Sequence, residues 1–238
     1  MNKLAVITGA TMGIGRALCE RFAKAGFDLL VNARGNDDLV NLKKSFEKEF
    51  SVKVFTKPTD VSDKQQVLDF AQFVNDLGRP IEVLINNAGY FVPGKIVNEE
   101  DGALESMINT NLYSAYHLTR GLVGNMIKNK RGLIINMCSI ASFMAYPNGG
   151  SYSISKFAML GFSKVLREEL KPYGIRVTSV MPGATLTSSW EGTVLPEERF
   201  IRPEDVAETV YSNRDQLSTS FHPGLNIHRR GNYGSNRI

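Results

Sequence analysis

Short runs of apolar residues alternate with longer segments of helical periodicity along most of this chain. The apolar runs at residues 4–8, 29–33, 52–55, 83–85, 133–137 and 176–181 are typical of buried strands. Helical segments lie between them, and residues 37–50 place Leu39, Leu42 and Phe46 on one face. Strands separated by helices predict an α/β fold built on a parallel sheet, in which ligands bind at the carboxyl ends of the strands.

The helix boundaries carry signals of their own. Gly26 is expected to end the first helix as a left-handed cap, and Ser62 is expected to cap the third. Residues 106–129 predict one long helix, and another helical pattern covers residues 156–170. Gly161 lies inside that last pattern, where a glycine indicates close helix packing.

The turn after the first apolar run is rich in glycine. Residues 8–15 read Thr-Gly-Ala-Thr-Met-Gly-Ile-Gly and lead directly into a helical pattern. Glycines permit a tight strand-to-helix turn, and their missing side chains let a pyrophosphate approach the amides at the helix N-terminus. The turn therefore predicts a phosphate site, with a plain glycine-rich turn as the alternative.

One stretch carries candidate proton chemistry. Tyr152 and Lys156 lie four residues apart, so they share one face of a helix. A phenol has a usual pKa of about 10 and is a poor acid catalyst, but a neighbouring ammonium lowers that pKa. Ser139, at the carboxyl end of a strand, can hydrogen-bond the same oxygen. This set suits proton transfer to a carbonyl or from an alcohol; the alternatives are a surface Tyr–Lys pair and a serine that caps a turn.

Composition narrows the class of protein. The chain has 238 residues, 42% hydrophobic and 22% charged, which is ample for one large core and short for two full domains. No apolar run approaches the roughly 20 residues of a membrane span, and no signal-peptide plan is present. The net charge of +4 is scattered, so no nucleic-acid surface is expected. His117, His222 and His228 show no metal spacing, and Cys19 and Cys138 are expected to be reduced thiols of a cytoplasmic protein.

Several motifs, in their order and spacing, resemble the short-chain dehydrogenase/reductase family. They are Thr8-Gly9-x-x-x-Gly13-x-Gly15, Asp60, Asn86-Asn87-Ala88-Gly89, Asn111, Ser139, Tyr152-x-x-x-Lys156 and Pro182-Gly183. The likeness extends over residues 3–233, nearly the whole chain. It implies a single Rossmann-type domain over residues 1–238, in which a doubly wound parallel sheet of about seven strands has three helices on each side.

The resemblance also implies roles for the candidate catalytic residues. Tyr152 is the general acid in reduction and the general base in oxidation, and Lys156 lowers its pKa and binds the nicotinamide ribose. Ser139 stabilises and orients the substrate oxygen. Asn111 distorts its helix, and its backbone carbonyl holds a water bound to the lysine. The hydride belongs to the cofactor.

Cofactor contacts are implied in the loops that follow the strands. The expected NAD(P)-binding residues are Gly9, Thr11, Met12, Gly13, Ile14, Gly15, Ala33, Arg34, Asp60, Val61, Asn87, Ala88, Gly89, Tyr152, Lys156, Pro182, Gly183, Thr185 and Thr187. NADP(H) is favoured because Ala33 replaces the acid usual in NAD-binding relatives and Arg34 follows it, with Asn32 and Asn36 as further donors. Met12 stands where many NADP-binding relatives carry a basic residue, so NAD(H) stays open as an alternative.

The predicted substrate pocket is apolar and aromatic, which favours a moderately hydrophobic carbonyl over a sugar. Its expected lining is Ser139, Phe91, Met137, Phe143, Met144, Tyr146 and Trp190, beneath a short lid over residues 186–202. Near the C-terminus, Arg229-Arg230-Gly231-Asn232 replaces the family's usual Val-Asp-Gly-Gly, which puts the last strand in question.

The sequence therefore predicts an NADP(H)-dependent oxidoreductase that reduces a ketone or aldehyde to an alcohol. Its general likeness is to 3-oxoacyl-carrier-protein reductases and broad-specificity carbonyl reductases. The alternatives are an NAD-dependent alcohol, polyol or steroid dehydrogenase working oxidatively, and a non-enzymatic dinucleotide-binding regulator. A homodimer or homotetramer is expected, because in the family the helices matching residues 106–129 and 152–170 pack against their symmetry mates. Neither a nucleic-acid partner nor a membrane is expected.

Overall fold

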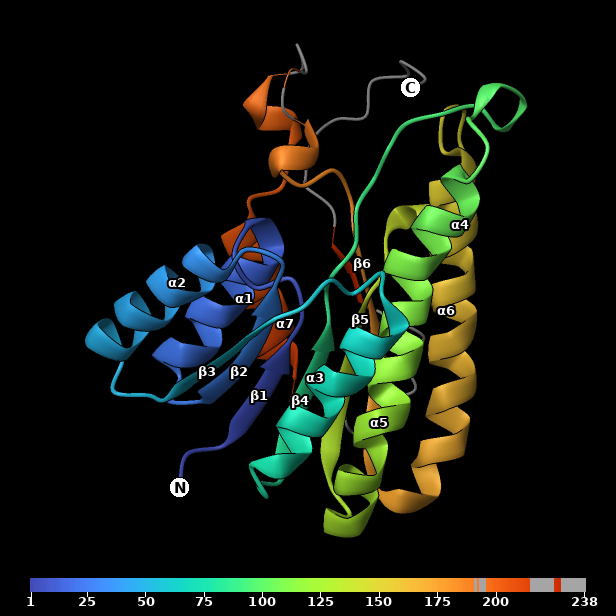
Figure 1. Cartoon of the computed structure of the whole chain (residues 1–238). Helices are drawn as coiled ribbons and strands as arrows, with labels where there is room; N and C mark the ends of the chain where they lie inside the picture. The colour runs from blue at the N-terminus through green and yellow to red at the C-terminus, as the bar shows by residue number, and fades with distance from the viewer. Residues whose placement is uncertain (191, 193–195, 215–224, 228–238) are drawn as a thin grey trace.

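A parallel β-sheet forms the centre of the molecule (Figure 1). The computed structural model describes residues 1–190, 192, 196–214 and 225–227. In that part of the chain the strands are β1 (Leu4–Ile7), β2 (Asp28–Ala33), β3 (Val54–Pro58), β4 (Ile81–Asn86), β5 (Gly132–Met137), β6 (Ile175–Pro182) and β7 (Leu225–Ile227). All neighbours pair in parallel, in the order β3-β2-β1-β4-β5-β6-β7. The predicted doubly wound sheet is confirmed, including the last strand, whereas residues 229–232 lie outside the described residues.

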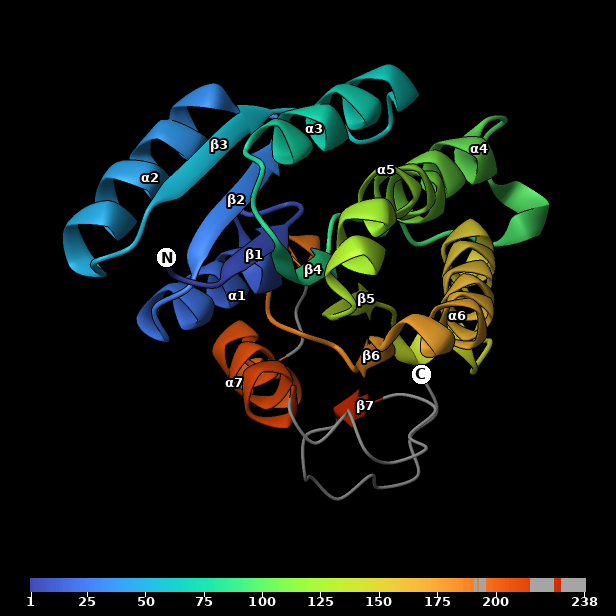
Figure 2. The same ribbon diagram turned by 90° about the horizontal axis from the view of Figure 1, so that it is seen from below.

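Helices cover both faces of the sheet (Figure 2). On one face lie α1 (Gly13–Lys24), α2 (Asn36–Glu49) and α7 (Pro203–Asn213), and on the other lie α3 (Lys64–Asp76), α5 (Ser114–Asn129) and α6 (Gly150–Leu170). Short 3₁₀ turns lie at Ile96–Asn98, Ile140–Ser142, Lys171–Tyr173, Ser188–Trp190 and Glu197–Arg199. None of the helices in the described ranges combines the length and hydropathy needed to cross a membrane.

Each helix layer buries its own apolar side chains against the strands. Phe22 and Leu39 pack on one face with Ile7 and Leu29, whereas Phe70 packs on the other. These strands are apolar on both sides, as expected for a parallel sheet covered by two layers of helices. The arrangement leaves the carboxyl ends of the strands as the edge where the connecting loops meet.

Two local predictions need correction. Asp63, not Ser62, is the N-cap of α3, because the Asp63 carboxylate accepts a hydrogen bond from the backbone of Gln66. The Ser62 hydroxyl instead donates to the Asp60 carboxylate. The third strand is also displaced from residues 52–55 to Val54–Pro58. Gly26 behaves as expected and follows α1 with a φ of +80°.

The predicted single helix over residues 106–129 is interrupted. It begins earlier, as α4 (Ala103–Ile108), widens into a π-helical turn at Asn109–Tyr113, and continues as α5. In the widened turn the backbone N–H of Ser114 reaches back to the carbonyl of Asn109. Asn111 lies within this turn, which agrees with the local distortion expected there.

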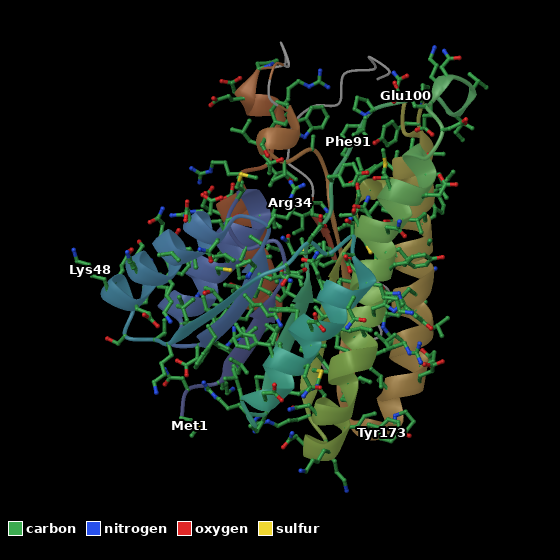
Figure 3. The ribbon with its side chains drawn as sticks, viewed as in Figure 1. Met1, Arg34, Lys48, Phe91, Glu100 and Tyr173 are labelled. Carbon is green, nitrogen blue, oxygen red and sulfur yellow. The ribbon has the colours of Figure 1, made fainter. Side chains whose placement is uncertain are left out.

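The side-chain view shows which residues gather at the carboxyl edge of the sheet (Figure 3). Arg34 and Phe91 lie toward that edge, whereas Met1 and Tyr173 lie at the opposite end of the molecule. Since Arg34 follows β2 and Phe91 follows β4, one edge collects residues that are far apart in the sequence.

Candidate active site

The glycine-rich turn between β1 and α1 can accept only glycine at its tightest point. A Cβ on Gly15 would lie 1.9 Å from the carbonyl oxygen of Gly9, and Gly9 itself has a φ of +67°. The first turn of α1 contains no acidic residue, and its N-cap residue, Met12, makes no side-chain cap. Backbone N–H groups at such a helix start attract an anionic phosphate. The turn therefore fits the predicted pyrophosphate site.

Side chains from neighbouring strands hold this turn in place. The Thr8 hydroxyl accepts hydrogen bonds from the backbone N–H groups of Asn87 (3.0 Å) and Ala88 (2.9 Å). The Asn87 amide donates to the carbonyl of Thr8 at 2.9 Å. The loop after β4 is thereby fixed beside the loop after β1, which brings Gly9, Asn87 and Ala88 together as predicted.

Asn32 has a different role from the predicted one. Its side chain is only 1% exposed, and its Oδ1 accepts a hydrogen bond from the backbone of Gly9 at 3.1 Å. It therefore supports the glycine turn from within β2 and does not stand at the surface as a donor to a ribose phosphate. The sequence placed it at the end of an apolar run, but its partner, Gly9, is distant in the chain, so the pairing has no local signal.

The end of β2 has a cation, Arg34, and no acidic residue at position 33, where NAD-binding Rossmann proteins usually have one. Ala33 is half-buried and Arg34 is exposed. Asp60, after β3, accepts hydrogen bonds from the Ser62 hydroxyl (2.7 Å) and backbone (2.9 Å). These bonds, helped by the charge of Arg34, hold the pKa of Asp60 below its ordinary value.

The loop after β6 approaches the glycine turn from the other side. A Cβ on Gly13 would lie 3.0 Å from the methyl group of Thr187. The loop is shaped locally, since the Thr185 hydroxyl donates to the carbonyl of Gly183 at 3.0 Å. Gly183 in turn donates its backbone N–H to Ile227 of β7 at 3.0 Å. The predicted contact residues after β1 and after β6 therefore face one another.

Ser139 and Tyr152 meet across this edge. Ser139 follows β5 and caps the turn Ile140–Ser142, where its Oγ accepts from the backbone of Ala141 at 3.1 Å. Tyr152 is the third residue of α6 and is half-buried. Burial raises the pKa of Tyr152 above its ordinary value, while a hydrogen bond from Ser139 acts in the opposite direction.

Lys156 lies behind the tyrosine, one helical turn along α6. Its side chain is buried, and its Nζ donates to the carbonyl oxygen of Met137 at 2.9 Å. The Nζ is 5.7 Å from the centre of the Tyr152 ring. Burial lowers the pKa of Lys156. In this geometry burial of the phenol is the main influence on the pKa of Tyr152, and the lowering of that pKa by Lys156 stays a prediction.

The side chain of Asn111 joins the π-helical turn to the loop after β4 and to α6. Its Oδ1 accepts from the backbone N–H of Tyr90 at 2.9 Å, and its Nδ2 donates to the Tyr90 carbonyl and to the Ser155 hydroxyl, both at 3.0 Å. Asn111 is therefore linked to α6 directly beside Lys156. Sequence reasoning missed Tyr90 and Ser155, since neither has a local signal that marks it as a partner of Asn111.

Three aromatic side chains, Phe91, Trp190 and Phe200, pack one against the next beside Tyr152. The rings of Phe91 and Tyr152 lie 4.8 Å apart, Phe91 and Trp190 lie 6.2 Å apart, and Trp190 packs on Phe200 at 5.1 Å. Phe200 was not predicted. The structure thus brings two of the predicted pocket residues, Phe91 and Trp190, to the candidate proton donor.

The other predicted pocket residues differ in position. Tyr146 is half-buried, and burial together with the charge of Tyr152 raises its pKa to about 12. Phe143 and Met144 are 43% and 53% exposed, so they lie at the surface. The side chain of Met137 is buried in the core on the face of the sheet that α1, α2 and α7 cover, and its carbonyl accepts a hydrogen bond from Lys156.

The fold and the site together define an oxidoreductase of the α/β class, and comparison with known proteins identifies the family. Residues 3–197 match the family model of the short chain dehydrogenases, so the chain belongs to that family. An uncharacterized oxidoreductase of Staphylococcus saprophyticus is 30% identical over 209 residues, which is 88% of this chain and 89% of that protein.

Solved structures show the same fold with dinucleotides bound. An alcohol dehydrogenase from the archaeon Thermococcus sibiricus, complexed with 5-hydroxy-NADP, has a TM-score of 0.87 at 26% identity and covers all of both chains. L-Sorbose reductase from Gluconobacter frateurii, complexed with NADPH and L-sorbose, has a TM-score of 0.86 at 28% identity over 95% of each chain.

Proposed function

We propose that this protein is an NADP(H)-dependent reductase that converts a ketone or aldehyde to an alcohol, with Tyr152 as the proton donor. The observation that carries the proposal is the placement of Tyr152 against Ser139, with Lys156 behind it and Phe91 and Trp190 over it. The bound cofactor would supply the hydride. The NADP-bound and NADPH-bound relatives support a nicotinamide dinucleotide as that cofactor.

The cofactor fits along the carboxyl edge of the sheet. The uncapped start of α1 would hold the pyrophosphate, and Arg34 would face the 2′-phosphate with a guanidinium of suitable charge and shape. The loops at Asn87–Gly89 and Pro182–Thr187 would hold the nicotinamide half, close to Lys156.

The proton step depends on groups of this chain. Ser139 donates to or accepts from the substrate oxygen and orients it toward Tyr152. The phenol of Tyr152 carries its proton at neutral pH, since even an ordinary tyrosine has a pKa of about 10, and the protonated form is the one that reduction requires. Asn111 supports this site through Ser155, which lies immediately before Lys156. Proton supply through a water on the Asn111 carbonyl is part of the same proposal.

The pocket suits an uncharged substrate. Phe91, Trp190 and Phe200 form a continuous aromatic wall beside the phenol, and such walls favour apolar or aromatic groups. The predicted lid over residues 186–202 has its two ends joined by backbone hydrogen bonds, from the Leu186 N–H to the Ile201 carbonyl and from the Ile201 N–H to the Ala184 carbonyl. Residues 191 and 193–195 of that segment lie outside the described residues.

A panel of carbonyl compounds tests the proposal. Loss of NADPH absorbance is measured with uncharged aromatic ketones and aldehydes, with keto sugars and with oxo acids. Turnover of uncharged ketones or aldehydes with NADPH above NADH is expected. The proposal fails if no carbonyl is reduced and an alcohol or polyol is oxidised efficiently with NAD instead.

A further inference from the structure

The N-terminus of α6, the helix that carries Tyr152, is not capped by the side chain of its own N-cap residue. Its N-cap residue is Gly149, which has no side chain, and Gly150, Ser151 and Tyr152 form its first turn. The first N–H groups of a helix need acceptors from outside the helix. The position of Tyr152 therefore depends on an acceptor supplied by another part of the chain.

Glu99 supplies that acceptor. It lies 52 residues before Ser151, just after the short turn Ile96–Asn98, and its Oε1 accepts from the backbone N–H of Ser151 at 2.9 Å. Its Oε2 accepts a short hydrogen bond from the Ser151 hydroxyl. A carboxylate at a helix N-terminus satisfies free donors and interacts favourably with the helix dipole.

The backbone around the Glu99 carboxylate leaves room only for glycine. A Cβ on Gly150 would lie 2.0 Å from Glu99 Oε1, and a Cβ on Gly94 would lie 2.8 Å from Glu99 Cγ. Gly94 also donates its N–H to the carbonyl of Asn148 at 3.0 Å. The segment after β4 and the start of α6 are therefore joined by backbone bonds as well as by the carboxylate.

The same segment contacts the site on the other side of the tyrosine. Phe91, eight residues before Glu99, packs its ring 4.8 Å from the ring of Tyr152. The backbone of Tyr90 makes two hydrogen bonds with the side chain of Asn111. The segment that contains Phe91 and Glu99 therefore supports Tyr152 in two ways. Phe91 packs on the ring of Tyr152, and Glu99 caps the turn of α6 that carries it.

We propose that Glu99 is a positioning residue for Tyr152. By capping the first turn of α6, it holds the phenol where Ser139 and the substrate oxygen can reach it. The inference rests on the proposed function, in which Tyr152 donates the proton. Glu99 itself does not touch the reacting atoms.

The first test compares three substitutions. Glu99→Ala should lower kcat about tenfold, because the first turn of α6 loses its cap and the phenol on that turn is less well placed, while KM and the Kd of NADPH change by less than about threefold. Glu99→Gln should stay within about threefold of wild type, because its amide can still accept from the Ser151 N–H and donate to the Ser151 hydroxyl. Glu100→Ala removes an exposed carboxylate at the next position and is the matched control (Figure 3).

A double-mutant cycle separates positioning from general stability. In a Tyr152→Phe background, Glu99→Ala should not reduce the residual turnover further, because the hydroxyl that it positions is gone. All rates are measured well below the Tm of each variant, so that the enzyme is folded. An equal loss in both backgrounds, or full kcat in Glu99→Ala, overturns the inference. Near wild-type turnover of Tyr152→Phe alone would instead overturn the proposed function.

Discussion

At the scale of single residues, Arg34 is expected to determine the choice of cofactor. It is exposed at the end of β2, and Ala33 beside it has no carboxylate of its own to repel a phosphate. Ala33→Asp combined with Arg34→Ala should weaken NADPH far more than NADH, because a cation is removed and an anion is added at the same place. The measurement is the ratio of kcat/KM for the two cofactors.

The matching control for cofactor choice is Lys48→Ala, a cation at the far end of α2 (Figure 3). It should leave the ratio unchanged. A wild-type preference for NADH, or an unchanged ratio in the double variant, would contradict the assignment of Arg34.

The ionisation of Tyr152 gives a second prediction for a single residue. Burial raises its pKa, so the phenol should keep its proton at pH values where exposed tyrosines have begun to ionise. In the cofactor-free enzyme, the ultraviolet difference between wild type and Tyr152→Phe should show that less than half of this phenol is ionised at about pH 10, the ordinary pKa of a tyrosine. Circular dichroism confirms that both remain folded. Ionisation well below pH 10 would mean that Lys156 dominates over burial.

At the scale of elements, the widened turn at Asn109–Tyr113 is held by the side chain of Asn111. Asn111→Ala removes three hydrogen bonds and leaves the part-buried backbone N–H and carbonyl of Tyr90 without this partner. We expect the free energy of unfolding to fall by about 1–3 kcal/mol. Urea denaturation measures this free energy. The control is Asn109→Ala, which lies in the same turn and has a half-buried side chain. It should lower the free energy of unfolding by less than about 0.5 kcal/mol. Equal effects of the two substitutions would contradict the role of Asn111.

The elements also show what could be predicted from the sequence. Alternating apolar runs and helical segments predicted the strands and their parallel pairing, because the central strands, such as β1 and β5, are buried on both faces. The glycine turn and the Tyr152–Lys156 spacing predicted a candidate site at the carboxyl edge of the sheet. The cap of α6 by Glu99 and the support of Gly9 by Asn32 had no local signal, since each bond joins residues that are distant in the sequence. The net direction of the Tyr152 pKa depends on burial, which only the packed structure reveals.

At the scale of the whole molecule, α6 exposes an apolar stripe. Ile154, Phe157 and Val165 are 41%, 45% and 58% exposed, and Gly161 lies between them. Among the described residues, nothing packs closely on Gly161 as predicted, since an added Cβ would have none of their atoms within 4 Å. A groove of about 460 Å³ between α5 and α6, lined by Val123, Ile127, Phe162, Leu166 and Tyr173, adjoins this side. We propose that a second copy of the chain covers this face, as expected for a homodimer or homotetramer.

Light scattering tests this assembly. Wild type should give the mass of a dimer or tetramer at micromolar concentration. Phe157→Glu combined with Val165→Glu should lower that mass, because burying two carboxylates opposes association. Lys44→Glu with Lys48→Glu, on the exposed side of α2, should not. A wild-type protein that is monomeric throughout would contradict the proposal.

The most direct test of the account is the turnover of Tyr152→Phe. Phenylalanine keeps the ring that packs against Phe91 but removes the hydroxyl that donates the proton. We predict that NADPH still binds, as measured by its fluorescence, and that carbonyl reduction slows by at least the factor of about 10²–10⁴ typical of general acid catalysis. Turnover near the wild-type rate with NADPH bound would contradict the assignment of Tyr152 as the proton donor.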